Sequence, residues 1–311
     1  MNIKHAQYML TVLQEGSITA AAKKLYISQP SLSQMIKLVE TNLGTPIFNR
    51  SSEAITLTYA GEKYIQAARQ ILTINDNLQK EIDEINHEDH GSLKLGIPVQ
   101  RAMQVLPCIL PPFKELYPHV DIQVYEHGSA TTEAMVMEGN VDLACLTTYP
   151  KHSELEYILV ETEELVLLTG KNSALARRIP DGTPIDITEA RDEPFINIRT
   201  GHSVRTTQDR LFIQKDMQPK VLLETSSIEV AKRTAIACNA MMICPYNYIE
   251  MSPELLPFCS TYPIIGIEQN RHFYICHRKD KYLTKYMKDF IHMLPDVLFT
   301  TGSVRSHKES E

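Results

Sequence analysis

The spacing of apolar residues predicts three helices in the first 45 positions. One apolar face stops at Gly16, and another begins after Ser28 and ends at Gly44. Between them, Ser17 can cap a short helix of small residues, and only a tight turn separates that helix from the next. This order is typical of a helix-turn-helix, whose second helix enters the DNA major groove. The apolar positions are Ala6, Met9, Leu10 and Leu13 in the first helix and Leu32, Ile36, Val39 and Leu43 in the third.

The polar face of the third predicted helix carries groups that suit DNA. Glutamine can hydrogen-bond an adenine edge, whereas serine and lysine more often contact phosphates. A solvated helix face explains this stripe equally well on its own. Two short strands at residues 46–50 and 54–58 would add a β-wing, which favours a winged helix-turn-helix. The candidate DNA-binding residues on the helix are Gln29, Pro30, Ser31, Ser33, Gln34 and Lys37.

A single long helix is predicted from residue 58 to about residue 86, where the chain contains no proline. Its apolar residues form a narrow line with a seven-residue repeat, which favours a dimerisation helix over packing within one domain. The next residues, 87–92, are polar and predict a hinge; their histidine and acidic side chains lack a partner cluster for a metal site. The repeat consists of Tyr64, Ile71, Leu78 and Ile85, with Ala67 or Ala68, Ile74 and Ile82 between them.

Beyond Gly91, predicted strands and helices alternate, which indicates an α/β fold with parallel sheets in two lobes. We expect strands at residues 92–97, 120–126, 141–146, 165–169, 195–198, 221–225, 241–244 and 273–277. We expect helices at residues 103–116, 131–138, 204–215, 228–238 and 282–298.

Length and composition support a multidomain globular protein. The 311 residues exceed the usual size of a single core, and 43% are hydrophobic and 22% charged. No apolar stretch is long enough for a membrane span or a secretion signal, so we expect a cytoplasmic protein without membrane contact. Residues 1–70 hold seven basic and four acidic side chains, a balance of +3 within a total of −7. A polyanion partner would therefore meet the N-terminal part.

Six cysteines are spread along the chain, without a CxxC pair or a histidine at ligand spacing. Neither a disulfide scaffold nor a zinc site is indicated. Cys238 and Cys244 lie six positions apart across a predicted helix-to-strand turn, which leaves a thiol or peroxide sensor open as an alternative.

The first sixty residues resemble the N-terminal domain of LysR-type transcriptional regulators. The resemblance implies that residues 29–41 form the recognition helix and that Arg50 contacts the DNA backbone from the wing. It also implies that the long helix pairs two subunits, that pairs assemble into tetramers, and that RNA polymerase is a candidate partner. The wing tip, residues 51–54, departs from the family by lacking a further basic residue. The matching residues are 16–22, 25, 28–33, 40, 43–44, 48–50 and 57–62. Two paired winged helix-turn-helix domains would bind an imperfect inverted repeat in double-stranded DNA.

Residues 91–298 resemble, more loosely, the effector domain of the same family, which is similar to periplasmic binding proteins. The runs that carry this resemblance are residues 106–107, 113, 117–118, 138–144 and 241–245. The resemblance implies two lobes joined by two crossover strands, which we place near Glu163 and Gly266. The expected domains are a winged helix-turn-helix at 1–58, a linker helix at 59–90, an effector domain at 91–300 and a tail at 301–311. Within the effector domain we expect one lobe at 91–162 and 267–300 and the other at 163–266.

A cleft between two such lobes collects helix N-termini, whose free N–H groups favour anions. Gln100 and Arg101 would add an amide and a cation to loops that carry hydroxyl groups. These groups predict a small carboxylate or similar anion as effector and no cofactor, although a helix cap or turn explains any single serine or threonine equally well. His202 would couple binding to pH if it titrates in the cleft. The candidate effector-binding residues are Pro98, Val99, Gln100, Arg101, Ser129, Thr147, Thr148, Thr200, Gly201, His202 and Ser203.

The combined features favour a ligand-responsive transcription regulator over an enzyme or a solute-binding protein. GxSxG, HExxH, GxxxxGK[ST] and GxGxxG are all absent, and the hydroxyl loops lack a matched base and orienting acid. A solute-binding protein would need an export signal and would not explain the basic N-terminal part.

Overall fold

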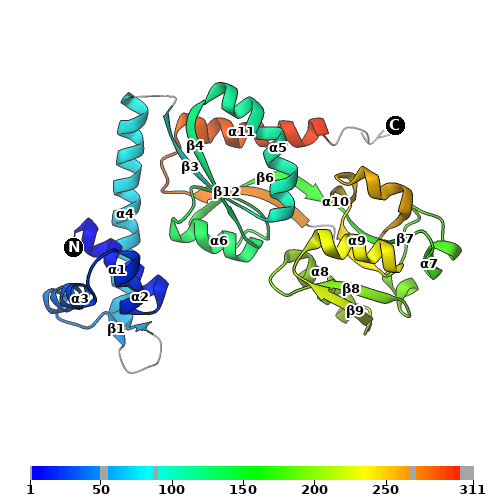
Figure 1. Cartoon of the computed structure of the whole chain (residues 1–311), viewed down its shortest axis with the longest axis horizontal. Coiled ribbons are helices and arrows are strands. Elements are labelled where there is room, and N and C mark those ends of the chain that lie inside the picture. Colours follow the sequence, from blue (N-terminus) through cyan, green and yellow to red (C-terminus); the bar gives the residue numbers. More distant parts are fainter. Residues whose placement is uncertain (1, 50–54, 87–89, 267–270, 302–311) are drawn as a thin grey trace. The chain divides into compact units, whose positions relative to one another are not determined.

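The computed structural model describes residues 2–49, 55–86, 90–266 and 271–301 (Figure 1). The chain forms two compact units, Met1–His87 with Asp280–Tyr282 and Glu88–Lys279 with Leu283–Glu311. In the described part of the chain, no helix combines the length and the apolar character that a bilayer crossing requires.

The first unit begins with helices α1 (Ile3–Glu15), α2 (Ile18–Lys24) and α3 (Gln29–Leu43). The Oγ atoms of Ser17 and Ser28 accept hydrogen bonds from the backbone N–H groups of Ala20 and Ser31, so both serines cap helices as predicted. Gly44 ends α3 with a φ of +76°, a conformation that glycine adopts at little cost. Strands β1 (Phe48–Asn49) and β2 (Thr56–Leu57) pair antiparallel and form the wing.

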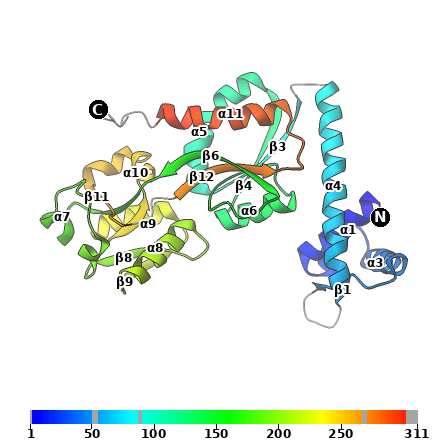
Figure 2. The same cartoon turned by 180° about the vertical axis from the view of Figure 1, so that it is seen from behind.

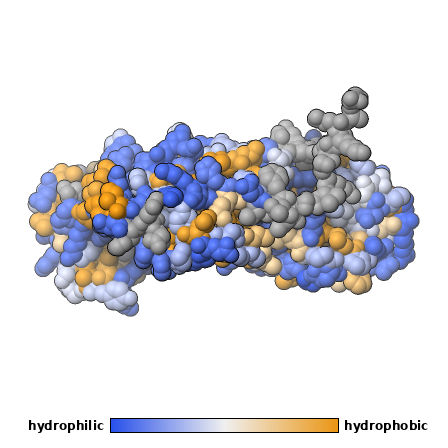
Figure 3. Space-filling model, turned by 90° about the horizontal axis from the view of Figure 1, so that it is seen from above, coloured by the Kyte–Doolittle hydropathy of each residue, from blue (hydrophilic) through white to orange (hydrophobic). Residues whose placement is uncertain are grey.

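The long helix α4 (Tyr59–Asn86) has two different surfaces along its length. Tyr64 and Ala68 are buried in the core of the first unit, so the prediction that they belong to a dimer seam was wrong. Their burial follows from the apolar faces of α1 and α3, which need a covering layer. The four large apolar side chains further along the helix are between 41% and 78% exposed; they are Ile74, Leu78, Ile82 and Ile85. Elsewhere, apolar patches interrupt a largely hydrophilic surface (Figure 3).

The first lobe of the second unit is built on a five-stranded sheet of order β4-β3-β5-β12-β6. Strand β3 pairs parallel with β4 and β5, whereas β12 pairs antiparallel with β5 and β6. The expected parallel pairing is confirmed for β3, β4 and β5 but wrong for β12, and β6 was not predicted as a strand. Its strands are β3 (His90–Ile97), β4 (His119–Glu126), β5 (Leu143–Thr147), β6 (Leu155–Glu163) and β12 (Arg271–Arg278).

Helices cover both faces of this sheet (Figures 1 and 2). Helices α5 (Val99–Leu116) and α11 (Lys285–Thr301) bury Val105 and Phe290 against β3 and β12 in one core cluster. Helix α6 (Ser129–Glu138) buries Val136 against β5 on the other face. Each of these helices has an apolar face, and packing it on the sheet removes it from water.

The second lobe contains two smaller sheets. Strand β7 lies between β10 and β11 and is antiparallel to both, and β8 pairs parallel with β9. The strands are β7 (Leu165–Gly170), β8 (Pro194–Ile198), β9 (Lys220–Thr225), β10 (Met242–Pro245) and β11 (Cys259–Pro263). The helices are α7 (Ala174–Arg178), η1 (Ile187–Ala190), α8 (Ser203–Gln214), α9 (Ile228–Cys238), α10 (Asn247–Glu250) and η2 (Pro253–Phe258). The chain enters this lobe between β6 and β7 and leaves it between β11 and β12.

Several predicted boundaries are wrong in an informative way. Helix α5 begins at Val99 rather than at residue 103, because Gln100 and Arg101 continue a helix without adding to its apolar pattern. His90 and Gly91 lie in β3 rather than in a hinge, since β4 offers them backbone partners. Residues 87–89 of the predicted hinge lie outside the described residues.

Candidate functional site

The exposed side of α3 carries most of the candidate DNA-binding residues. Gln34 and Lys37 are exposed and make no hydrogen bond or ion pair with another described residue. Ser33 is half-buried and accepts a hydrogen bond from Gln29 Nε2 at 2.9 Å. The hydroxyl of Ser31 is 2.7 Å from that of Ser28. Gln29, Pro30 and Ser31 are exposed at the start of the helix, and Arg50 lies outside the described residues. Gln34 and Lys37 are thus the side chains most available to a duplex.

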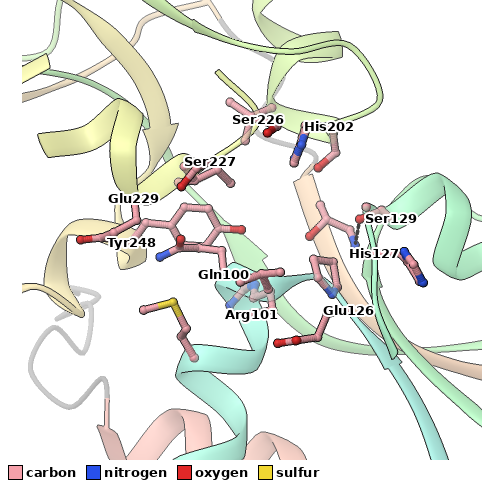
Figure 4. A pocket seen from close by; sticks show the side chains of 18 residues that line it. Gln100, Arg101, Glu126, His127, Ser129, His202, Ser226, Ser227, Glu229 and Tyr248 are labelled. Carbon is pink, nitrogen blue, oxygen red and sulfur yellow. Dashed lines mark hydrogen bonds between the residues drawn. The ribbon is translucent and has the colours of Figure 1, made fainter. Parts of the chain in front are cut away.

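Two adjoining cavities lie between the lobes of the second unit, with volumes of about 480 Å³ and about 260 Å³. Ser129, Thr147, His202 and Ser203 line both cavities and mark their junction. Ser129 and His202 are labelled in the view of the larger cavity (Figure 4). The larger cavity is also lined by the candidate residues Pro98, Val99, Gln100 and Arg101, and the smaller one by Thr148 and Gly201. Thr200 is exposed and lines neither of these two cavities.

Three helices begin at these cavities without a side-chain cap. The N-cap residues of α5, α6 and α8 are Pro98, Gly128 and His202, and none accepts a hydrogen bond through its side chain. By contrast, Ser173 and Ser227 cap α7 and α9. The first N–H groups of a helix have no partner within the helix, and together with the helix dipole they attract negative charge. The two cavities are therefore suited to an anion, and at their junction the starts of α6 and α8 lie together.

Arg101 does not offer the free cation that we expected. Only 1% of its side chain is exposed, and Nη1 donates to Glu161 at 2.8 Å while Nη2 donates to Glu163. Its guanidinium also lies 4.0 Å from the ring centroid of Phe273. Burial acts to lower the pKa of Arg101, but the attraction of Glu163, Tyr248 and Glu161 outweighs it and raises the pKa. Its charge is thus matched inside the protein.

Glu163 and Arg271 are site residues that sequence reasoning missed. Arg271 Nε donates to Glu163 at 2.6 Å, and its Nη2 donates to Ser203 Oγ at 3.0 Å, which joins β12 to α8 of the other lobe. Burial acts to raise the pKa of Glu163, but Arg271 and Arg101 hold it below the usual value. The sequence carried only a weak signal, because both strands contain several other polar residues and the buried acid and base do not stand out among them.

The walls of the smaller cavity carry a further buried acid and an exposed base. Glu133 accepts a hydrogen bond from Tyr157 at 2.8 Å and pairs with Lys151 at 2.7 Å. Arg210 of α8 lies 6.0 Å from the ring centroid of Tyr149. Glu133 is thus neutralised by Lys151, whereas Arg210 makes no ion pair with another described residue.

Comparison with known proteins decides the family. Residues 3–62 match the family described as "Bacterial regulatory helix-turn-helix protein, lysR family", and residues 86–298 match "LysR substrate binding domain". The chain belongs to the LysR family of transcriptional regulators. It is accordingly a DNA-binding regulator with an effector-binding domain and not an enzyme.

Individual relatives of this LysR-family chain are moderately similar to it. The transcriptional regulator YcgK of Bacillus subtilis (strain 168) is 32% identical over 248 residues, which cover 75% of this chain and 76% of that protein. BsdA of the same organism is 29% identical and covers 72% and 77%, respectively. Full-length OxyR from Pseudomonas aeruginosa shares the fold, with a TM-score of 0.71, 18% identity and coverage of 100% and 99%. CbnR in complex with its target DNA has a TM-score of 0.57, 20% identity and coverage of 96% and 100%.

The cysteines of this LysR-family chain are all free thiols in the structure. Cys244 is buried in β10, and burial raises its pKa to about 12. Cys145 is buried in β5, where burial likewise raises the pKa to about 12. Cys238 is exposed at the end of α9. The predicted Cys238–Cys244 pair thus consists of one accessible thiol and one thiol that is protonated near neutral pH.

Proposed function

We propose that the protein regulates transcription in response to a small anion that binds between the lobes of its effector domain. The observation that carries this proposal is the convergence of three uncapped helix N-termini, those of α5, α6 and α8, on the two adjoining cavities. A carboxylate at the junction would accept hydrogen bonds from the first N–H groups of α6 and α8, whose first residues Ser129 and Ser203 line both cavities, with the Ser129 hydroxyl as a further donor.

We propose that α3 lies in the major groove of the operator. Gln34 can donate to and accept from a base edge, and Lys37 can pair with a phosphate. Gln29 and Ser33 hydrogen-bond to each other, which supports a role in orienting the exposed surface rather than in reading bases. Arg50 of the wing would contact the backbone.

We also propose that α4 pairs two copies of the chain. Ile74, Leu78, Ile82 and Ile85 expose a continuous apolar stripe along one side of the helix, at intervals of four, four and three residues. Such a stripe is the usual seam of a two-helix contact. Two DNA-binding units related by a twofold axis would then read an imperfect inverted repeat.

The DNA-binding proposal is tested by operator binding of purified variants at several salt concentrations. Lys37→Ala should weaken binding to all duplexes and reduce the slope of log affinity against log salt by about 1. Gln34→Ala should cost about 1–3 kcal/mol on the operator and relax preference at one base pair. Lys171→Ala removes an exposed charge from the effector domain and serves as the control. Unchanged operator binding by both α3 variants would contradict the proposal.

The anion proposal is tested by thermal unfolding of the full-length protein with carboxylates and with the corresponding neutral amides. Carboxylates should raise the melting temperature and change operator affinity, whereas the amides should not, because helix N-termini stabilise negative charge. Equal stabilisation by amide and acid would show that the cleft does not sense anions.

A further inference from the structure

A large apolar side chain, Leu38, lies near the centre of the exposed face of α3. It is 49% exposed. Successive residues of an α-helix are about 100° apart around its axis, which places Leu38 about 40° from Gln34 and about 60° from Thr41. Both of these neighbours are exposed. The buried Ile36 lies about 160° away from Leu38, so this leucine points away from the core of its unit.

The fold does not require a leucine at this position. Glutamine and lysine form helices about as well as leucine, and they keep a polar end in water. Leaving a leucine half exposed is unfavourable, because its apolar surface stays in contact with water. Single exposed leucines are common on protein surfaces, but this one stands beside Gln34 and Lys37, which we propose to contact the duplex. A partner on the DNA would cover it.

The major groove offers a leucine one methyl group, the 5-methyl of thymine. The other groups that distinguish the bases there are hydrogen-bond donors and acceptors, which a leucine cannot pair with. Contact between the side chain of Leu38 and this methyl group would remove both from water, and that is favourable. A leucine on the recognition helix therefore favours thymine.

The spacing of Leu38 from Gln34 fits neighbouring bases. Side chains four positions apart on a helix lie on the same side, with Cβ atoms about 5–6 Å apart. Neighbouring base pairs are about 3.4 Å apart along the duplex. The two side chains can thus reach bases that are one or two base pairs apart.

We propose that Leu38 contacts the 5-methyl group of a thymine in each half-site and is a specificity-determining residue of α3. This inference rests on the proposed placement of α3 in the major groove. The thymine lies one or two base pairs from the base that Gln34 contacts. The contact involves no phosphate, so it adds a preference for thymine rather than general affinity for duplexes.

The test uses a duplex that the full-length protein selects from a pool of random sequences, with each thymine replaced in turn by deoxyuridine. This replacement removes only the methyl group and keeps the base pair. We expect one thymine in each half-site at which it weakens wild-type binding about fourfold, the effect of one buried methyl group. Replacing both thymines should weaken binding about tenfold or more, because the two half-sites are far apart.

Leu38→Ala should abolish this sensitivity, with less than about twofold difference between thymine and deoxyuridine, because the methyl group then has no partner. Leu38→Met keeps a long apolar side chain and should retain most of the sensitivity. Leu43→Ala is the matched control, since Leu43 is 46% exposed on the same helix. It lies about 140° around the axis from Leu38, so this variant should respond to deoxyuridine as the wild type does.

Wild-type binding that is insensitive to every deoxyuridine would overturn the inference, and so would equal sensitivity of Leu38→Ala and wild type. If Leu38→Ala keeps the sensitivity but sediments as a smaller species, Leu38 contacts a second copy of the chain instead of DNA. The placement of α3 in the groove survives either result if Lys37→Ala and Gln34→Ala still weaken binding. If neither of these variants weakens binding and no thymine matters, both proposals fail.

Discussion

A Cβ atom on Gly128 would lie 3.2 Å from the carbonyl oxygen of Gly201. The N-cap of α6 in one lobe therefore lies against the loop before α8 in the other, at the junction of the two cavities. Gly128 has a φ of −63°, which alanine adopts without strain, so its lack of a side chain serves this close approach. The two uncapped helix ends can share one anion only while the lobes remain this near.

Gly128→Ala should separate the two helix ends by a few tenths of an ångström. We expect effector affinity to fall about three- to tenfold, because both ends must reach the same ligand, while the unfolding free energy changes by less than about 1 kcal/mol. Calorimetry with an active carboxylate and urea unfolding measure the two quantities. An unaltered affinity would show that the approach of Gly128 to Gly201 has no role in the site.

Gly61→Ala tests the packing of the linker helix on the wing. A Cβ atom there would lie 2.1 Å from the carbonyl oxygen of Ile47, the residue before β1, a distance that forces α4 and this backbone apart. We expect a loss of about 2 kcal/mol or more in unfolding free energy, typical of overpacking in a core. Gln66→Ala, at an exposed position of α4, should change stability by less than about 0.5 kcal/mol. Equal unfolding curves for Gly61→Ala and wild type would contradict the contact.

The DNA-binding unit could be predicted from sequence because its determinants are local. Ser17, Ser28 and Gly44 fix helix ends through bonds to residues three or four positions away, and the wing strands are adjacent in the chain. Tyr64 was wrongly assigned to the dimer seam. A seven-residue apolar repeat has the same pattern whether the helix packs on its own domain or on a second copy of the chain.

Long-range pairing explains what was missed in the effector domain. Apolar and polar residues alternate only weakly along strand β6. The strand is therefore recognisable only beside β12, which lies more than a hundred residues later. For the same reason Glu163 and Arg271, 108 positions apart, could not be joined from sequence. Ten of the eleven predicted effector-binding residues line one of the two cavities, because helix N-termini follow strands at predictable places.

Leu78→Asp and Ile82→Asp should separate the proposed pair, because an aspartate in an apolar seam must lose its water. We expect the variants to sediment as monomers. Operator affinity should fall about a hundredfold or more, since each DNA-binding domain would then bind alone. Asn75→Asp adds the same charge at an exposed position beside the stripe and should remain paired. Sedimentation of both seam variants as the wild-type species would disprove the role of the stripe.

His202 should make effector binding depend on pH in a defined direction. Burial lowers its pKa below the ordinary value of 6.5, so the folded protein holds this proton less tightly than the unfolded chain. Stability is therefore lost as the pH falls below that ordinary value. A bound anion would instead favour the proton, so affinity should rise by up to about tenfold between about pH 8 and about pH 5.5. His202→Gln should flatten this profile; a slope that persists in the variant would assign it to another group.

We expect peroxide to leave operator binding unchanged. With a pKa of about 12, Cys244 is almost entirely protonated at neutral pH, and the thiolate is the form that reacts with peroxide. Cys238 is exposed, but its candidate disulfide partner, Cys244, lies inside β10 in the core of the second lobe. The double variant Cys238→Ser and Cys244→Ser should match the wild type within about twofold, with or without oxidant. Mass spectrometry of the oxidised protein provides the decisive control, because a Cys238–Cys244 disulfide that shifts operator affinity would establish redox sensing despite the burial.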